Sequence, residues 1–263
     1  MLAATETYAI EDFDDTPVSS DEALFPDLDP GYYDTLTGRW HKPTSPTEER
    51  VYKTVCHERI LKYFTTGLSD LELEFHPNGD LWSFLVVEKP QLTTRVEWAV
   101  QIAEGLAQLH SNSIVWSDAH FRNVLVTQDL NIVLCDFAFS VFNPQIYHDF
   151  TTAPPPIFIA PWGYFGLPPT YVDIFGFGVM LFALLANRFP WTDDLLPNMD
   201  AQTEAMAKHG RREFDTLEAF PDLNAHFGEV VTKCFQATYL TGTELLHDLK
   251  CARDGWLQSQ GPN

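Results

Sequence analysis

Two short polar motifs, with an apolar run between them, constrain this chain more than any other feature. The stretch Ile114–Asn123 reads IVWSDAHFRN, and in it Asp118 is followed five residues later by Asn123. Asp136 follows the apolar run Ile132–Cys135, whose branched side chains are typical of a buried strand. This spacing predicts a loop between two strands in which two carboxylates and one amide converge. Such oxygens bind hard cations such as Mg²⁺, and Asp118 remains able to accept a proton.

The segment resembles the catalytic loop of eukaryotic protein kinases, whose order is H-R-D-x-x-x-x-N followed by D-F-G. The first motif reads WSD at 116–118, with Asn123 in register, and the second reads DFA at 136–138. The resemblance covers residues 48–252, and within the family the sequence is most similar to fungal kinase-like proteins. It implies an α+β, two-lobed protein kinase-like fold with a truncated β-rich N-terminal lobe and a mainly helical C-terminal lobe.

The resemblance also implies roles for these side chains. Asn123 and Asp136 would bind Mg²⁺, and Asp118 would orient or deprotonate the accepting hydroxyl, with ATP as the second cofactor. Arg122 stands where tyrosine kinases and some fungal kinase-like proteins carry an arginine, and its guanidinium would neutralise the transferring phosphoryl group. A surface arginine paired with a nearby carboxylate is an equally weighted interpretation of Arg122.

The N-terminal part of the chain gives the weakest resemblance. Residues 1–46 are acidic and rich in turn formers, and their two glycines, Gly31 and Gly38, form no G-x-G-x-x-G phosphate loop. Lys42 is the one lysine placed to pair with phosphates, and Glu48 is in register with the glutamate that pairs with such a lysine in the family. Because only six residues separate them, we expect a surface position for Glu48 instead of an ion pair. An acidic, poorly ordered segment is favoured over a remnant N-terminal lobe, either truncated or highly divergent.

The next segment predicts two strands around a turn, followed by a connector. Within it, the sequence LEFH at 73–76 resembles the hinge of protein kinases. The resemblance implies that the backbone C=O of Glu74 and N–H of His76 bind the adenine edge. Asp80 is then the candidate partner of the ribose.

Helical spacing of apolar residues predicts the remainder of the domain, which we place at 47–255 with a tail at 256–263. Asp173 matches the aspartate that ties the central helix to the backbone of the catalytic loop, and a helix N-cap is a compatible role. The predicted helices cover 48–55, 95–110, 174–186, 204–208, 227–236 and 244–252.

A paired departure from the family's pattern gives a further expectation. Trp162 stands where A-P-E carries its glutamate, and Tyr239 stands where the partner arginine would be. Replacing both partners of a buried ion pair by packed apolar groups can leave stability unchanged. We therefore expect Trp162 and Tyr239 to lie close together.

The charge balance restricts the partners of the chain. It has 37 acidic and 16 basic side chains, a formal net charge of −21, whereas nucleic acids and anionic membranes need a basic surface. A protein substrate or partner, basic in character, fits better. The four cysteines form no C-x-x-C pair, which favours an intracellular location, cytoplasmic or nuclear, without disulfides or a zinc site.

Two functions remain open from the sequence. The first is ATP- and Mg²⁺-dependent phosphoryl transfer to a Ser, Thr or Tyr hydroxyl of a protein, at a low or degenerate level. The second is a pseudokinase that acts as a non-catalytic binding or scaffold module. The three residues in register favour the first, and the missing glycine-rich loop favours the second.

Overall fold

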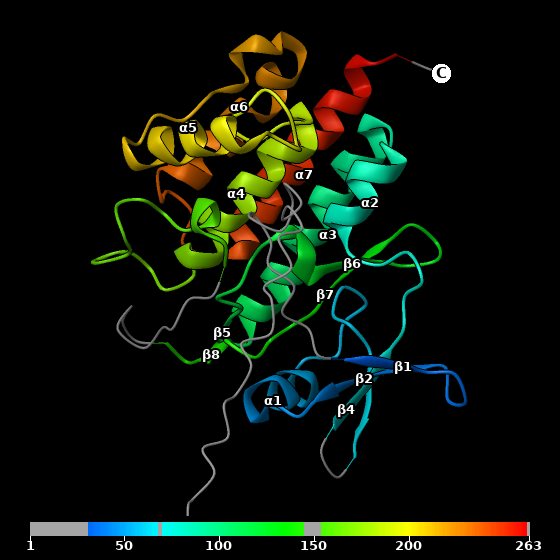
Figure 1. Cartoon of the computed structure of the whole chain (residues 1–263). Helices are drawn as coiled ribbons and strands as arrows, with labels where there is room; N and C mark the ends of the chain where they lie inside the picture. The colour runs from blue at the N-terminus through cyan, green and yellow to red at the C-terminus, as the bar shows by residue number, and fades with distance from the viewer. Residues whose placement is uncertain (1–30, 68–69, 145–153, 262–263) are drawn as a thin grey trace, which may run out of the picture.

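The computed structural model describes residues 31–67, 70–144 and 154–261. Figure 1 shows a small antiparallel sheet with one helix at one end of the molecule and a larger helical part at the other. The α+β, two-lobed architecture predicted from the motifs is confirmed. The strands are β1 (Tyr32–Asp34), β2 (Arg39–Pro43), β3 (Tyr63–Thr66), β4 (Asp70–Glu74), β5 (Ile114–Val115), β6 (Val124–Val126), β7 (Ile132–Leu134) and β8 (Val141–Phe142). The helices are α1 (Pro46–Thr54), α2 (Leu81–Glu88), α3 (Leu92–Ser111), α4 (Tyr171–Ala186), α5 (Met199–Gly210), α6 (Pro221–Phe235) and α7 (Gly242–Ser259), with 3₁₀ turns η1 (Phe121–Asn123), η3 (Pro156–Phe158) and η4 (Leu217–Ala219).

The sheet of the N-terminal lobe has the order β1-β2-β4-β3, and every neighbouring pair is antiparallel. Its first two strands form a hairpin whose turn contains Gly38 at φ 69°, a left-handed backbone that glycine adopts without strain. The interpretation of 1–46 as a poorly ordered tail is therefore wrong for residues 32–43, which are strand and turn. A remnant lobe describes these residues better. The part of that segment before residue 31 lies outside the described residues.

The helical lobe is built around α4, which is apolar on every side and buried from Tyr171 to Leu185. A helix of this composition has no face that prefers water, so neighbouring helices surround it. Helices α3 and α6 pack against α4, and α7 packs along α3 and α6. In the described part of the chain, no helix is both long and apolar enough to cross a membrane.

The C-terminal boundary placed at residue 255 is also corrected. Helix α7 continues to Ser259, and the indole of Trp256 is 4% exposed. Trp256 contacts the ring of Phe227 on α6, with the ring centroids 6.1 Å apart. Because this side chain packs into the lobe, residues 256–259 belong to the domain.

Two short strand pairs hold the two ends of the predicted loop that contains Asp118 and Asn123. Strand β5 pairs with β8 and β6 pairs with β7, and both pairs are antiparallel. The segment between β5 and β6 therefore starts and ends at fixed positions. Within it, Phe121 is fully buried against Trp82, Phe158 and Phe189, with ring centroids 6.1 to 6.3 Å apart. This aromatic cluster anchors η1.

Gly176 of α4 lies against the backbone of this loop, and we predict that Gly176→Ala destabilises the protein. An added Cβ would lie 2.6 Å from the carbonyl oxygen of Ala119, so the loop or the helix must shift. Overpacking of this kind costs about 1–3 kcal/mol, more than the ~1 kcal/mol that alanine gains over glycine in a helix. Urea unfolding measures the change.

Gly210→Ala, at the end of α5, is the matched control, because an added Cβ there meets no heavy atom within 4 Å. It should leave the free energy of unfolding unchanged or raise it by up to about 1 kcal/mol. Equal effects of the two substitutions would contradict the close approach at Gly176.

Candidate functional site

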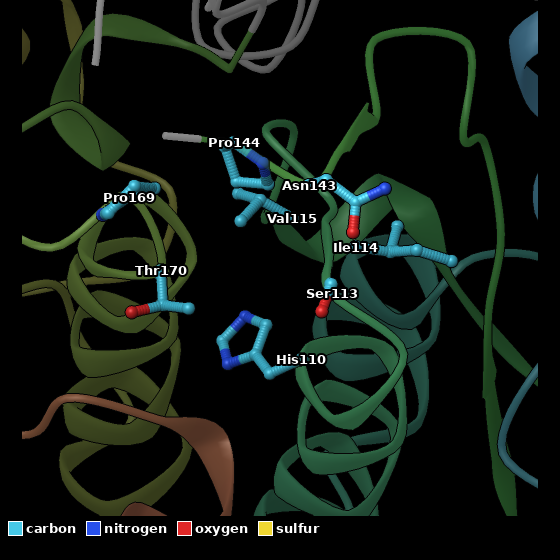
Figure 2. Close-up of a pocket in the computed structure, with 8 residues that line it drawn as sticks. All are labelled: His110, Ser113, Ile114, Val115, Asn143, Pro144, Pro169 and Thr170. Atoms are coloured by element: carbon cyan, nitrogen blue, oxygen red, sulfur yellow. The ribbon is translucent and has the colours of Figure 1, made fainter. Parts of the chain in front are cut away.

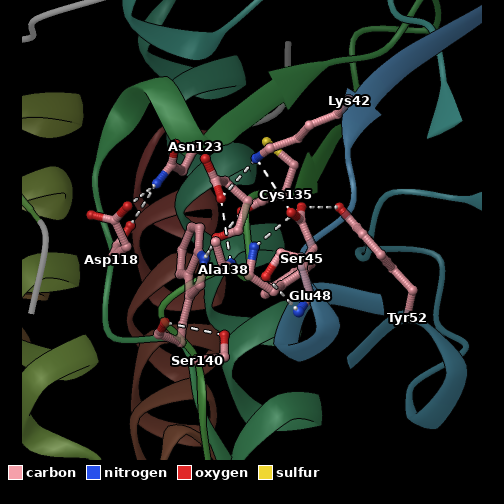
Figure 3. A network of polar contacts seen from close by, with 12 residues as sticks. Lys42, Ser45, Glu48, Tyr52, Asp118, Asn123, Cys135, Ala138 and Ser140 are labelled. Atoms are coloured by element: carbon pink, nitrogen blue, oxygen red, sulfur yellow. Dashed lines mark hydrogen bonds and ion pairs between the residues drawn. The ribbon is translucent and has the colours of Figure 1, made fainter. Parts of the chain in front are cut away.

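An ion-pair cluster joins the sheet, helix α1 and the segment after β7. Nζ of Lys42 lies 3.3 Å from Oε2 of Glu48 and 2.9 Å from Oδ1 of Asp136 (Figure 3). The side chain of Glu48 is completely buried, and that of Lys42 is 12% exposed. The expectation that Glu48 lies on the surface without this ion pair is therefore wrong.

The local sequence explains how Lys42 and Glu48, only six residues apart, can form an ion pair. Lys42 is the last residue but one of β2, which ends at Pro43, and α1 begins three residues after that, at Pro46. Ser45 is the N-cap and its hydroxyl accepts a hydrogen bond from the backbone N–H of Glu48. Glu48 therefore sits in the first turn, where the helix dipole favours a negative charge, and directly faces the end of β2.

Burial dominates the electrostatics of Glu48. Loss of water raises the pKa of its carboxyl above 4.5, and the charge of Lys42 opposes this rise. Oε1 also accepts hydrogen bonds from the hydroxyl of Tyr52, at 3.2 Å, and from the backbone N–H of Phe137, at 3.4 Å. Burial, together with the neighbouring carboxylate, holds the pKa of Tyr52 well above its ordinary value, so this hydroxyl stays a donor.

The loop between β5 and β6 places Asp118 and Asn123 in contact, as Figure 3 shows. Nδ2 of Asn123 donates to the backbone oxygen of Asp118 at 3.0 Å and to its Oδ2 at 2.8 Å. The other carboxylate oxygen, Oδ1, is buried, accepts no hydrogen bond from the described residues, and lies 3.3 Å from Nε2 of His120. Arg122 is partly buried in η1, and its backbone N–H donates to Nδ1 of His120.

Asp173 of α4 holds the start of this loop, as the sequence predicted. Its two oxygens accept from the backbone N–H groups of Trp116, at 2.8 Å, and Ser117, at 2.7 Å. It is not the N-cap, however, because Thr170 takes that position. Nε2 of His110 also contacts Asp173 at 2.9 Å, while Nδ1 of His110 accepts from the N–H of Gly242. The ring therefore carries its hydrogen on Nε2 and connects α3, α4 and α7 to the loop.

Trp116 replaces the histidine of the family's motif and supplies an N–H of its own. Its Nε1 donates to the carbonyl oxygens of Cys135 and Asp136, both at 3.0 Å. The indole lies 6.1 Å from the ring of Phe137, which in turn meets Tyr52 edge-on at 5.2 Å. A continuous aromatic column thus runs from α1 through Phe137 to the catalytic loop. Sequence reasoning missed this role, although a buried indole needs an acceptor and its neighbours supply carbonyl oxygens.

The hinge-like residues lie where β4 ends. The backbone N–H of His76 makes no hydrogen bond with the part of the chain that the structure describes, which leaves it able to bind a ligand. The His76 ring is almost fully buried, and burial lowers its pKa. Glu74 sits at the last paired position of β4. Asp80 is the N-cap of α2, and its two oxygens accept from the N–H and hydroxyl of Ser83, so ribose binding by this residue stays a prediction.

Trp162 and Tyr239 take different partners. Trp162 contacts the rings of Phe175 and Phe214, with centroids 5.7 and 5.6 Å away. The hydroxyl of Tyr239 donates to Asp248 at 3.0 Å. Since no ring contact joins Trp162 to Tyr239 within the described ranges, the expected direct packing of this pair is not confirmed.

The residues present fit a nucleotide-bound magnesium ion. Oδ1 of Asn123 and Oδ2 of Asp136 accept no hydrogen bond from the described residues, so two oxygens remain for a cation. The described chain contains no group of three or more His, Cys, Asp or Glu arranged to hold a metal. Mg²⁺ commonly binds through one or two protein ligands together with substrate phosphates, which suits such a sparse set.

A cavity of about 210 Å³ lies behind the catalytic loop, between β5, the end of β8 and the start of α4 (Figure 2). It is lined by His110, Ser113, Ile114, Val115, Asn143, Pro144, Pro169 and Thr170. No predicted site residue lines it, so it is not the proposed nucleotide site.

Comparison with known proteins agrees with this geometry. Residues 37–241 match the protein kinase domain family. The chain is 30% identical over 158 residues to the serine/threonine-protein kinase kin-29 of Caenorhabditis elegans, covering 56% of this chain and 19% of that protein. It is 29% identical over 162 residues to the SNF1-related protein kinase catalytic subunit alpha KIN12 of Arabidopsis thaliana, covering 58% and 32%. The chain spans less than a third of the length of these relatives.

Among solved structures, the kinase domain of Rad53, in complex with AMPPNP, matches with a TM-score of 0.63 at 17% identity and covers 88% of each chain. At this identity the likeness shows the fold alone. Because the two named relatives come from a nematode and a plant, the fungal likeness stays a prediction.

We predict that Lys42→Met destabilises the protein by about 3–5 kcal/mol near neutral pH, because it leaves a buried carboxylate without its cation. The double variant Lys42→Met/Glu48→Gln should recover part of this loss. Urea unfolding of the single and double variants measures both changes, and a single variant as stable as the parent would contradict the ion pair.

The same variants should differ in their dependence on pH. A carboxyl whose pKa is raised in the folded state contributes stability below its ordinary value of 4.5, and this contribution is lost as pH rises through the folded pKa. Removing Lys42 raises the pKa of Glu48 further, so the destabilisation by Lys42→Met should grow as the pH rises above 4.5. The double variant, which lacks the carboxyl, should not show this growth.

Proposed function

Since the chain belongs to the protein kinase family, we propose that it transfers the γ-phosphoryl group of Mg-ATP to a hydroxyl group of a protein, at a low rate. The observation that carries this proposal is the contact of Lys42 with both Glu48 and Asp136, together with the hydrogen-bonded pair of Asp118 and Asn123. These are the positions that the family uses for phosphate binding, metal binding and proton acceptance.

Asn123 and Asp136 would hold the metal, and Lys42 would hold the phosphates. When bound, Mg²⁺ neutralises the negative charge that develops between the two outer phosphates. Glu48 fixes the ammonium of Lys42 at 3.3 Å and so limits where the phosphates can sit. The N–H of His76 and the C=O of Glu74 are the candidate contacts of the base.

Asp118 is the candidate proton acceptor. Asn123 donates to one carboxylate oxygen at 2.8 Å, and the other, which accepts no hydrogen bond from the described residues, is the candidate acceptor of the substrate proton. His120 lies 3.3 Å from that second oxygen and limits its orientation. Arg122, in the same turn, would stabilise the negative charge of the transferring group.

The substrate is a protein. Because the named relatives are serine/threonine-protein kinases, a Ser or Thr hydroxyl is favoured over that of Tyr. The net charge of −21 favours a basic substrate or partner. None of the four cysteines forms a disulfide, which supports an intracellular location, cytoplasmic or nuclear.

The alternative is a pseudokinase that serves as a binding or scaffold module. The sequence before β2 contains no G-x-G-x-x-G loop to cover the phosphates. Since positioning of the phosphates supplies much of the rate of phosphoryl transfer, this absence favours a low or vanishing activity.

We predict that Asp118→Asn lowers phosphoryl transfer by about 10²–10⁴-fold, the usual contribution of a general base. The amide can still accept a hydrogen bond from Asn123, so the loop should keep its geometry. Transfer from radiolabelled ATP to basic proteins measures the rate. Asp129→Asn, in the exposed turn between β6 and β7, is the matched control and should retain full activity. Transfer that is insensitive to Asp118→Asn would contradict the proposed role.

Nucleotide binding separates the two candidate functions. Millimolar Mg-ATP should raise the melting temperature of the protein, because a ligand that binds only the folded state stabilises it. Asp136→Asn should reduce this shift, since it removes one charge from the metal site. If the parent protein gives no shift and no transfer, the result contradicts phosphoryl transfer and favours the scaffold function.

A further inference from the structure

The strand that carries Lys42 also places Trp40 on the same face of the sheet. Side chains alternate along a strand, so residues two apart share a face. Lys42 faces α1 and Asp136, so Trp40 lies on the same face of the sheet as this ion-pair cluster. His41 lies on the opposite face, where its ring stacks on Tyr32 at 4.9 Å.

The indole extends from the start of β1 to the hinge-like segment. Trp40 is partly buried and packs nearly parallel to the ring of Phe75, with an interplanar angle of 17° and centroids 6.3 Å apart. On its other side the indole covers Gly31, where an added Cβ would overlap the ring. Across the sheet, Trp40 pairs with Tyr33 on one neighbour and with Leu73 on the other.

This position coincides with the path of a nucleotide. Its base would meet the backbone of Glu74 and His76, and its phosphates would reach Lys42. The base and sugar must therefore lie against the face of the sheet that carries Trp40 and its cross-strand partner Leu73. Leu73 is 2% exposed and already packed into the core, so the flat ring of Trp40 is the group that meets the base.

We propose that the indole of Trp40 occupies the position of the nucleotide base, so that Trp40 limits the affinity of the protein for ATP. This inference rests on the proposed function, because it assumes that the hinge-like segment and Lys42 bind a nucleotide. The phosphates and the metal would bind at Lys42, Asn123 and Asp136, whereas the base has to displace the indole. The low rate of transfer proposed above then has two causes, which are the weak binding of ATP and the absence of a G-x-G-x-x-G phosphate loop.

The test measures adenosine binding, which depends on the base site and needs neither metal nor phosphate. Trp40→Val keeps a strand-forming residue and removes the ring, and it should bind adenosine at least about tenfold more tightly than the parent protein. Trp40→Phe, with a smaller ring that still packs on Phe75, should give a smaller gain and guards against a folding defect of the valine variant. Calorimetric titration measures the affinities.

Tyr32→Ala is the matched control, because it removes an aromatic ring from the opposite face of the same sheet. It should leave the affinity for adenosine unchanged. In the transfer assay, Trp40→Val should lower KM for ATP with little change in kcat, which a purely structural role of Trp40 would not produce.

An affinity for adenosine that is equal to or lower than that of the parent protein in both Trp40 variants would overturn the proposal. A lower affinity would mean that the indole instead stacks on the base. Magnesium tripolyphosphate provides the separate test of the proposed function, since it needs only the phosphate and metal groups. One outcome is that tripolyphosphate binds neither the parent protein nor Trp40→Val, while Trp40→Val still binds adenosine more tightly than the parent. This outcome would contradict the phosphoryl-transfer function and support the base-site role of Trp40.

Discussion

The site depends on one buried negative charge, the carboxylate of Glu48. An isolated carboxylate cannot be buried without a large loss of solvation, so Glu48 requires partners from every element that surrounds it. Lys42 comes from β2, Tyr52 from α1 itself and the backbone of Phe137 from the segment after β7. The need to compensate this one charge therefore fixes the sheet, the helix and the segment after β7 relative to one another.

A second buried acid, Asp173, does the same for the other lobe. It is fully buried in the central helix and holds the first backbone N–H groups of the catalytic loop, and His110 connects it to α3 and α7. Trp116 joins the two systems, because its backbone binds Asp173 while its indole binds the carbonyl oxygens next to Phe137. The chain thus departs from the family's motif at this position but keeps a hydrogen-bond donor there. In this chain the indole N–H satisfies the carbonyl oxygens of Cys135 and Asp136.

Trp40 differs from Trp116 in the contacts of its indole. The indole of Trp40 satisfies no acceptor in the described part of the chain and instead fills space between β1 and the hinge-like segment. In the proposal made above, this ring takes the space of a nucleotide base, while the polar contacts of Lys42, Glu48 and Asp136 are kept. Weak binding of the base would then account for the low rate of transfer proposed for this member of the protein kinase family.

The sequence by itself predicted the loop that brings Asp118 and Asn123 together, the strand before Asp136 and the anchoring contacts of Asp173, because those residues follow short, fixed spacings along the chain. It also contained the capping signal Ser45-x-x-Glu48, which places a helix start directly after the strand. The prediction that Glu48 forms no ion pair with Lys42 was nevertheless wrong. Whether side chains six residues apart can meet depends on how the strand end and the first helical turn face each other, and the spacing alone does not give this orientation. The partners of Trp116, the separate environments of Trp162 and Tyr239, and the position of the Trp40 indole were decided only by the tertiary structure. Each involves contacts between residues distant in the chain, and only packing brings such residues together.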